Sequence, residues 1–245
     1  MKKLMAANWK MHKSQKETLD FLHDLEAIAG ALPEDREIAI FPPFTVLHLF
    51  NKLPKGCVVG GQNCHAEKEG AFTGEISAMM LKDAGCTHVL VGHSERRAIF
   101  HEQDDFITER TAAALAAGLH VVFCIGETLA EREAGTLAHV LERQLQSLPQ
   151  SVKGLAATVS VAYEPVWAIG TGKVAGPAEI VEAHAIVRKT LVAMYGTEGN
   201  MVRILYGGSV KPENTAEILG LANVNGVLVG GASLQSKSFS QIVLA

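Results

Sequence analysis

The sequence of 245 residues has no long hydrophobic run, because its apolar segments are short and interrupted by polar residues. A membrane-spanning helix needs about 20 consecutive apolar residues, so we expect no membrane partner. The first apolar segment, residues 1–7, resembles the start of a signal peptide, but Asn8-Trp9-Lys10 interrupts it too early. We therefore expect a cytoplasmic protein without a signal peptide.

The chain also has no strong excess of charge of one sign. It carries 22 Lys and Arg against 26 Asp and Glu, a formal net charge of -4, and the basic residues are scattered. Proteins that bind nucleic acids usually gather positive charge on one face or helix. The sequence therefore predicts no nucleic-acid partner.

Cysteine is scarce, and the sequence contains no Cys-x-x-Cys motif. Its four cysteines are Cys57, Cys64, Cys86 and Cys124. In a cytosolic protein such residues are typically reduced and structural. A zinc site built from Cys64, His65 and a distant histidine is the alternative, but the ligand spacing typical of zinc is missing. We expect no bound metal.

No linker rich in Ser, Gly or Pro divides the chain, so residues 1–245 are expected to form a single domain. Short apolar segments alternate with segments of helical periodicity. The apolar segments are 4–7, 38–41, 58–61, 88–91, 121–125, 159–163, 202–206 and 226–229. Apolar residues at successive positions are typical of parallel strands that are buried on both faces. The series predicts an α/β fold, most simply a closed (β/α)8 barrel, with an open doubly wound sheet as the alternative.

Local signals predict where several helices begin. Ser14 is expected to cap an amphipathic helix with Leu19 on its apolar face, and Thr45 to cap a short helix that ends near residue 53. Asp104 and Asp105 are typical first-turn acids of a helix. Paired catalytic carboxylates are the alternative for these two aspartates.

In a (β/α)8 barrel the reacting groups gather at the carboxyl ends of the strands. The polar and thiol residues at those positions are Asn8, Lys10, His93, Glu95, Cys124, Glu127 and Glu164. A carboxylate, an imidazole and a lysine together suggest proton transfer on a small phosphorylated carbonyl compound. Glu164 would remove a proton next to the carbonyl, His93 would hydrogen-bond the oxygens, and Lys10 would hold the anion.

Each of these residues also has a structural alternative. His93 could be a core histidine, and Lys10 a solvated surface lysine. Cys124 is expected to be a small apolar filler beside the base. Ser94-Glu95-Arg96-Arg97 is typical of a helix's first turn, and a helix N-terminus disfavours imidazolium, so we expect a neutral His93.

Two glycine turns indicate the substrate's anionic group. Gly207-Gly208-Ser209 and Gly230-Gly231-Ala232-Ser233 follow the seventh and eighth predicted strands. Glycine lets backbone N–H groups approach an oxyanion, and this end of the fold is a common phosphate site. Tight strand-to-helix packing is the alternative explanation for either turn alone.

The segment after Glu164 predicts a lid over residues 165–175. Pro165 and the apolar residues that follow are stiff, and small residues lie near the far end, which suits a loop that closes as a unit. An ordinary strand-to-helix loop is the alternative. Gly170-Thr171-Gly172-Lys173 lacks the upstream glycine of a P-loop, so a nucleotide site is not expected.

Seven segments, taken together and in order, resemble the triosephosphate isomerase family nearly from end to end. They are Asn8-Trp9-Lys10-Met11, Gly70-Ala71-Phe72-Thr73-Gly74-Glu75, Gly92-His93-Ser94-Glu95-Arg96-Arg97, Cys124-Ile125-Gly126-Glu127, Tyr163-Glu164-Pro165-Val166-Trp167-Ala168-Ile169-Gly170-Thr171-Gly172, Tyr206-Gly207-Gly208-Ser209-Val210-Lys211 and Leu228-Val229-Gly230-Gly231-Ala232-Ser233-Leu234. The resemblance implies a single-domain TIM barrel. It also implies interconversion of D-glyceraldehyde 3-phosphate and dihydroxyacetone phosphate without a cofactor, in glycolysis and gluconeogenesis.

The resemblance also implies roles for individual residues. Glu164 matches the family's base and His93 its neutral electrophile, a pairing for which this family is a standard example. Glu95 matches a partner of the substrate-binding lysine. The substrate-binding and phosphate-binding positions match Asn8, Lys10, Gly170, Ser209, Gly230 and Gly231.

A homodimer is likewise implied. In the family, the loop that corresponds to residues 62–76 inserts beside the partner's active site, with Thr73 at its tip. Two departures from the family pattern stand out. Asn225 occupies a position where Asp is usual and pairs with an arginine, here matched by Arg188. Gly176 lies in a variable far hinge of the lid and is expected to loosen it.

Two other functions remain open on the residues alone. The first is a phosphate-binding barrel aldolase in which Lys10 forms a Schiff base. The second is a catalytically dead barrel kept as a binding protein. The presence of Asn8, Lys10, His93 and Glu164 together favours the isomerase.

Overall fold

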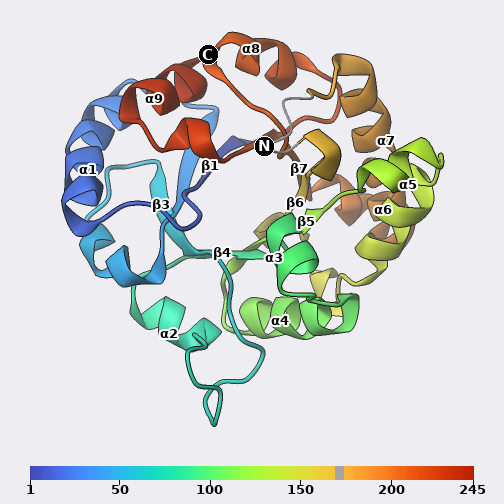
Figure 1. The fold of residues 1–245 in the computed structure, drawn as a ribbon, viewed down its shortest axis with the longest axis horizontal. Coiled ribbons are helices and arrows are strands. Elements are labelled where there is room, and N and C mark those ends of the chain that lie inside the picture. Colours follow the sequence, from blue (N-terminus) through green and yellow to red (C-terminus); the bar gives the residue numbers. More distant parts are fainter. Residues whose placement is uncertain (169–173) are drawn as a thin grey trace.

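The computed structural model describes residues 1–168 and 174–245, and within them eight parallel strands close into a barrel (Figure 1). The strands follow one another around the barrel in sequence order, and β8 pairs with β1. They are β1 (Lys3–Asn8), β2 (Arg36–Phe41), β3 (Cys57–Gly61), β4 (His88–Val91), β5 (His120–Ile125), β6 (Val159–Tyr163), β7 (Arg203–Tyr206) and β8 (Gly226–Val229). The predicted (β/α)8 barrel is confirmed, and an open sheet is excluded.

Helices surround the strands (Figure 1). The α-helices are α1 (Gln15–Gly30), α2 (Ala78–Asp83), α3 (Ser94–Ile99), α4 (Asp104–Ala116), α5 (Leu129–Glu133), α6 (Leu137–Gln146), α7 (Pro177–Tyr195), α8 (Pro212–Gly220) and α9 (Ser236–Leu244). Short 3-10 helices are η1 (Phe44–Phe50), η2 (Gln150–Val152), η3 (Ala156–Thr158), η4 (Val166–Ala168), η5 (Gly196–Asn200) and η6 (Gly231–Ser233). Ser14 caps α1, as its sequence position predicts, with Glu17 completing a capping box.

Two local predictions are wrong. Leu19 is 53% exposed, and Phe21 lies on the buried face of α1 instead, with its ring in edge contact with Trp9. Thr45 does not cap a helix, because η1 begins at Phe44 after Pro43 and ends at Phe50. The predicted end near residue 53 is therefore too late.

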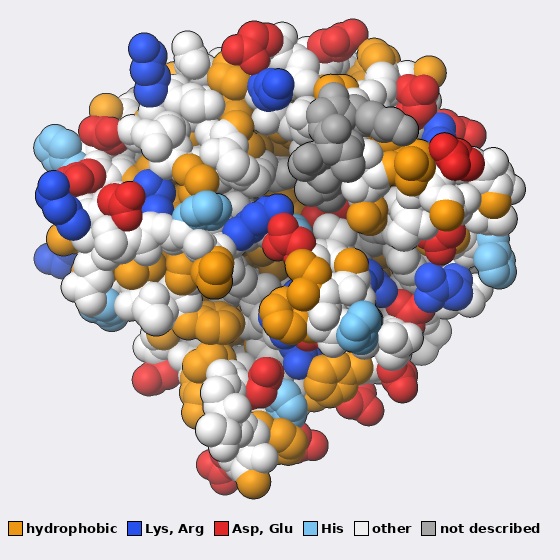
Figure 2. All heavy atoms as spheres, viewed as in Figure 1, with side chains coloured by type: hydrophobic (Ala, Val, Ile, Leu, Met, Phe, Trp, Pro, Cys, Tyr) orange, Lys and Arg blue, Asp and Glu red, His pale blue; other side chains and the backbone are white. Residues whose placement is uncertain are grey.

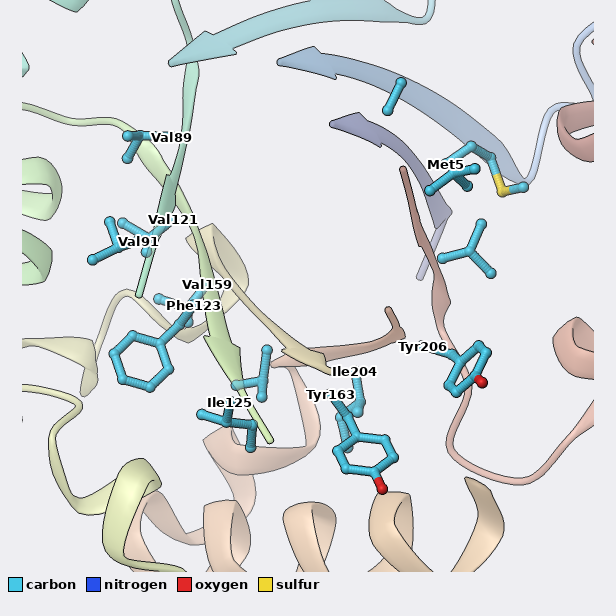
Figure 3. Packing of buried hydrophobic residues seen from close by; sticks show 14 of the residues in the cluster. Met5, Val89, Val91, Val121, Phe123, Ile125, Val159, Tyr163, Ile204 and Tyr206 are labelled. Carbon is cyan, nitrogen blue, oxygen red and sulfur yellow. The ribbon is translucent and has the colours of Figure 1, made fainter. Parts of the chain in front are cut away.

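The apolar core has two layers, one on each face of the strands. Inside the barrel, alternate strand residues form a small cluster that consists of Leu4, Ala6, Ala39, Phe41, Leu90, Val122, Cys124, Ala162, Leu205 and Leu228. The residues between them, such as Met5 and Val121, belong to the larger cluster between strands and helices, part of which Figure 3 shows. Burial on both faces explains why the strands are apolar at successive positions.

The segment between β3 and α2 leaves the barrel and projects away from it (Figure 1). It carries Thr73, which is exposed, near its tip. The base of the segment is closed by the N–H of His65, which donates to the carbonyl of Ile76 at 2.8 Å. Across residues 1–168 and 174–245, no helix is long and apolar enough to cross a membrane.

Candidate active site

The carboxyl ends of the strands surround a cavity of about 300 Å³. It is lined by Asn8, Lys10, His93, Glu164, Ala168, Gly207, Gly208, Ser209, Val210, Lys211, Leu228, Gly230, Gly231 and Ala232. The structure thus brings together the predicted acid–base residues and both glycine turns. Gly170, which the resemblance assigns to the phosphate site, lies outside the described residues, as do all of residues 169–173 of the predicted lid.

Glu164 follows β6 and is buried, with 1% of its surface exposed. Its Oε1 lies 2.9 Å from Nε2 of His93, and its Oε2 accepts the backbone N–H of Ser94 at 2.9 Å. Its backbone is held closely as well, since a Cβ on Gly126 would lie only 1.7 Å from the Glu164 carbonyl oxygen. The position of Glu164, the predicted base, is therefore fixed through both its backbone and its carboxylate.

His93 is the N-cap residue of α3, at the end of β4. Its Nδ1 accepts the backbone N–H of Glu95 at 3.2 Å, which in the neutral ring favours the tautomer with the proton on Nε2, toward Glu164. The charge state of the ring depends on the groups around it, and these raise its pKa rather than favour the expected neutral form. A core histidine satisfied by backbone alone does not fit, because Nε2 faces the cavity's carboxylate.

The Glu164–His93 contact shifts both groups toward their charged forms. Burial opposes charge on His93, but the Glu164 carboxylate outweighs burial and raises the imidazole pKa. Burial likewise opposes charge on Glu164, but His93 and the Ser94 N–H outweigh it and lower the carboxyl pKa. The N-terminus of α3 disfavours a charged His93, which is why a neutral ring was expected, but the nearer Glu164 carboxylate favours the charged ring.

Lys10 follows β1 in a left-handed backbone conformation, with φ of +53°. Its N–H donates to Oδ1 of Asn8 at 3.0 Å, and its carbonyl accepts from Nε2 of Gln62 at 2.8 Å. Its Nζ lies 2.5 Å from Oε1 of Glu95. These contacts exclude a free surface lysine. The sequence does not predict the role of Gln62, which depends on the close packing of two loops.

The two glycine turns line the cavity next to Glu164 and Lys10. A Cβ on Gly207 would lie 2.9 Å from Cγ of Glu164, so this position leaves room for the base. Gly231 begins η6, and a Cβ there would meet no atom within 4 Å among the described residues. Lys211 also lines the cavity and adds a positive charge that the sequence analysis did not single out.

Three other predicted residues lie around the site. Cys124 is fully buried in the cluster inside the barrel, and burial raises its thiol pKa, as expected for an apolar filler. Glu127 is buried and accepts hydrogen bonds from Tyr163 and Trp167. Asp104 contacts Arg97 and Arg143, so it serves as a helix-end acid rather than as half of a catalytic pair. Among the described residues no group of three or more His, Cys, Asp or Glu side chains could hold a metal ion.

The two departures from the family pattern are also visible. Oδ1 of Asn225 accepts from Nη2 of Arg188 at 3.0 Å, so the predicted pair exists as a hydrogen bond. Gly176 caps α7 with φ of -77°, a conformation open to other residues. The backbone there does not require glycine.

Known proteins of one family resemble this chain along nearly its whole length. A family model described as Triosephosphate isomerase matches residues 3–245. The triosephosphate isomerase of Nitratidesulfovibrio vulgaris (strain DSM 19637 / Miyazaki F) is 59% identical over 251 residues, which cover all of both chains. That of Aquifex aeolicus (strain VF5) is 46% identical, with 99% of each chain covered. A crystal structure of triosephosphate isomerase from Bartonella henselae matches with a TM-score of 0.89 and 42% identity, covering 99% of this chain and 98% of that one.

Proposed function

The chain belongs to the triosephosphate isomerase family, and we propose that it interconverts D-glyceraldehyde 3-phosphate and dihydroxyacetone phosphate. The observation that carries this proposal is the 2.9 Å contact between Glu164 and His93 in a cavity that Lys10 and two glycine turns also line. These groups supply a base, a hydrogen-bond donor and an anion site for one small molecule.

In the proposed reaction, Glu164 removes a proton from the carbon next to the carbonyl group. The electron pair of that C–H bond moves into the carbonyl, which yields an enediolate. Nε2–H of His93 donates to the oxygens on which the negative charge develops. Glu164 then returns the proton to the neighbouring carbon, while the hydroxyl proton passes from one substrate oxygen to the other beside Nε2 of His93, so the reaction requires no external oxidant or reductant.

Substrate binding has to separate Glu164 from His93, because in this structure each satisfies the other. Once the substrate lies between them, the nearest carboxylate no longer raises the pKa of His93, and burial then favours the neutral ring. A neutral imidazole with its proton on Nε2 is the donor that the enediolate oxygens need. The Nδ1 acceptor bond from Glu95 supports this tautomer.

We propose that Asn8 and Lys10 bind the triose and that Ser209, Gly230 and Gly231 bind its phosphate, together with Gly170 of the predicted lid over residues 165–175. Support comes from the cavity, where Lys10 Nζ is held by Glu95 and the glycines of the two turns leave their backbone N–H groups open to a ligand. A positive charge and backbone N–H groups favour an anionic group at this end of the fold.

The aldolase alternative is less well supported. A Schiff base requires a lysine amine that is free to attack a carbonyl, whereas Nζ of Lys10 is held 2.5 Å from Oε1 of Glu95. Borohydride trapping in the presence of substrate separates the two reactions, because only an aldolase would become labelled at Lys10. The dead-barrel alternative conflicts with the retention of Lys10, His93 and Glu164 in one cavity.

We further propose a homodimer. A second recess of about 220 Å³, lined by Lys10, Gln62, Glu95 and Phe100 among others, adjoins the active site. Orange apolar side chains gather at the base of the projecting segment in Figure 2. Exposed apolar residues on this segment and on the elements beside it are Met11, Phe72, Met79, Met80, Ile99 and Phe100. A projection and a neighbouring recess on one chain suit an isologous interface.

The proposed activity implies a place in glycolysis and gluconeogenesis in the cytoplasm. We also infer that residues 1–245 act as one domain, because their strands close a single barrel. The direct test is a coupled assay that starts from glyceraldehyde 3-phosphate and detects dihydroxyacetone phosphate. Turnover without added metal or cofactor is expected. The absence of product formation by folded protein would overturn the proposed function.

A further inference from the structure

Arg97 of α3 lies directly behind the pair formed by His93 and Glu164. Its Nε donates to the carbonyl of Gly92 at 2.8 Å, and its Nη2 donates to the carbonyl of Cys124 at 3.2 Å. Its Nη1 contacts Oδ1 of Asp104 at 2.6 Å. A single side chain therefore connects the ends of β4 and β5 to the first turn of α4.

The turn that Arg97 holds carries both contacts to the proposed base. His93 supplies the imidazole, and Ser94 supplies the N–H that donates to Oε2 of Glu164. This turn leaves β4 through Gly92, whose φ of +72° is a left-handed conformation that glycine tolerates. Gly92 thus allows the turn, but it does not fix the turn's direction.

Packing alone does not fix this region either. A cavity of about 190 Å³ lies behind Glu164, with Gly92, Ser94, Arg97 and Val166 in its wall. Helix α3 has only six residues, too few to be stable without outside contacts. Directional hydrogen bonds from Arg97 tie the turn to the ends of β4 and β5.

We propose that Arg97 is a positioning residue, whose guanidinium fixes the Gly92–Ser94 turn so that His93 and Ser94 meet Glu164. Its planar fork suits this role, because it bonds two carbonyls and a carboxylate at once, which a lysine cannot do. The proposal rests on the isomerase function proposed above. Arg97 itself does not line the substrate cavity.

The test compares Arg97→Met with Arg143→Met. Arg143 contacts the same carboxylate, Asp104, but its side chain is 47% exposed, and within residues 1–168 and 174–245 it forms no hydrogen bond or ion pair with either strand end. We expect Arg97→Met to lower kcat by roughly 10- to 100-fold with little change in KM, because the reacting groups lose their alignment. Arg143→Met is expected to keep wild-type kcat.

Two further readouts distinguish positioning from simple destabilisation. The Ser94 N–H is one of the groups that lower the pKa of Glu164, so loss of its alignment should move the acid limb of kcat/KM to higher pH in Arg97→Met. In Arg97→Ala, guanidinium ion at concentrations well below those that unfold the protein should restore part of kcat, whereas sodium chloride at equal ionic strength should not.

The outcomes separate the two proposals. Wild-type protein without isomerase activity refutes the proposed function. An active wild type, with Arg97→Met matching Arg143→Met in kcat and pH profile, refutes the role of Arg97 alone. If Arg97→Met fails to fold, Arg97→Lys is measured instead, because it keeps the charge but cannot bond both carbonyls. Wild-type kcat in Arg97→Lys would also overturn the proposal.

Discussion

Oε1 of Glu164 lies 2.9 Å from Nε2 of His93, so the two residues proposed to act on different parts of one substrate are hydrogen-bonded to each other. The contact stabilises the carboxylate in a buried position, where burial alone would favour the neutral acid. It also marks the space that the substrate has to enter. Small displacements of either group should therefore have large effects on turnover.

Glu164→Asp tests this sensitivity. The substitution withdraws the carboxylate by about one methylene, so it no longer reaches the carbon and both existing contacts together. We expect kcat to fall by about 10²-fold, with KM little changed and the fold intact. Steady-state kinetics and circular dichroism measure these effects. Glu182→Asp, on an exposed side chain of α7, is the matched control, and near-normal turnover in Glu164→Asp would exclude Glu164 as the base.

Gly231→Asp tests the phosphate site. A carboxylate at this position would repel a dianionic substrate, so we expect KM to rise at least tenfold with a smaller effect on kcat. Gly231→Ala separates charge from bulk, because a Cβ there meets no described atom within 4 Å. The alanine variant should have a KM near that of the wild type. Equal KM values for the aspartate and alanine variants would place the phosphate elsewhere.

The barrel and the residues that line its cavity could be predicted from the sequence because their signals are local. Strand segments are apolar at successive positions, and the reacting side chains follow them directly. The buried faces of the helices were harder to predict. Phe21 rather than Leu19 is buried, because its ring contacts Trp9 and Phe239, and the periodicity of the helix does not reveal those contacts.

The parts of the site that hold the reacting groups were not predictable in the same way. Gln62 bonds the carbonyl of Lys10, and Arg97 bonds the carbonyls of Gly92 and Cys124. Such contacts join a side chain to a backbone atom of another element. Any residue type supplies that carbonyl, so no sequence pattern marks the partner.

Thr73→Glu tests the proposed dimer. A charge near the tip of the projecting segment would have to be buried in the partner, which costs several kcal/mol without a counter-charge. We expect a monomer by light scattering, with lower kcat. Thr197→Glu places the same change at an exposed site on η5 and should leave the oligomeric state unaltered. A dimer of unchanged affinity in Thr73→Glu would show that this segment lies outside the interface.

Asn225→Asp tests the departure from the family pattern. Oδ1 of Asn225 accepts from Arg188 at 3.0 Å and from the N–H of Ile204 at 3.0 Å. A carboxylate would turn the first bond, in which only Arg188 is charged, into an ion pair, so we expect the free energy of unfolding to rise by about 1 kcal/mol with kcat unchanged. Urea unfolding measures it. In an Arg188→Met background the gain should vanish, and a persistent gain would assign it to another contact.

His88 provides a test of acid stability at the opposite, amino-terminal end of the barrel. It begins β4 and stacks on His120, which begins β5, with ring centroids 4.7 Å apart. Burial, with smaller effects of His120 and Arg203, lowers the pKa of His88 to about 3. In the unfolded chain this residue should take up a proton near its ordinary value of about 6.5.

The sign of the pH effect follows from these two values. Between about pH 6.5 and pH 3 the unfolded state binds a proton at His88 that the folded state does not, so stability falls as the pH falls. The slope from one such group approaches 1.4 kcal/mol per pH unit.

His88→Phe keeps a ring against His120 but removes the titration, so its unfolding free energy should decline less between about pH 6.5 and pH 4 than that of the wild type. His139→Phe, at an exposed position on α6, should retain the wild-type slope. Urea unfolding at a series of pH values gives the slopes directly, and equal slopes for His88→Phe and wild type would mean that acid sensitivity arises from other groups, of which buried His184, with its pKa lowered to about 4, is the next to replace.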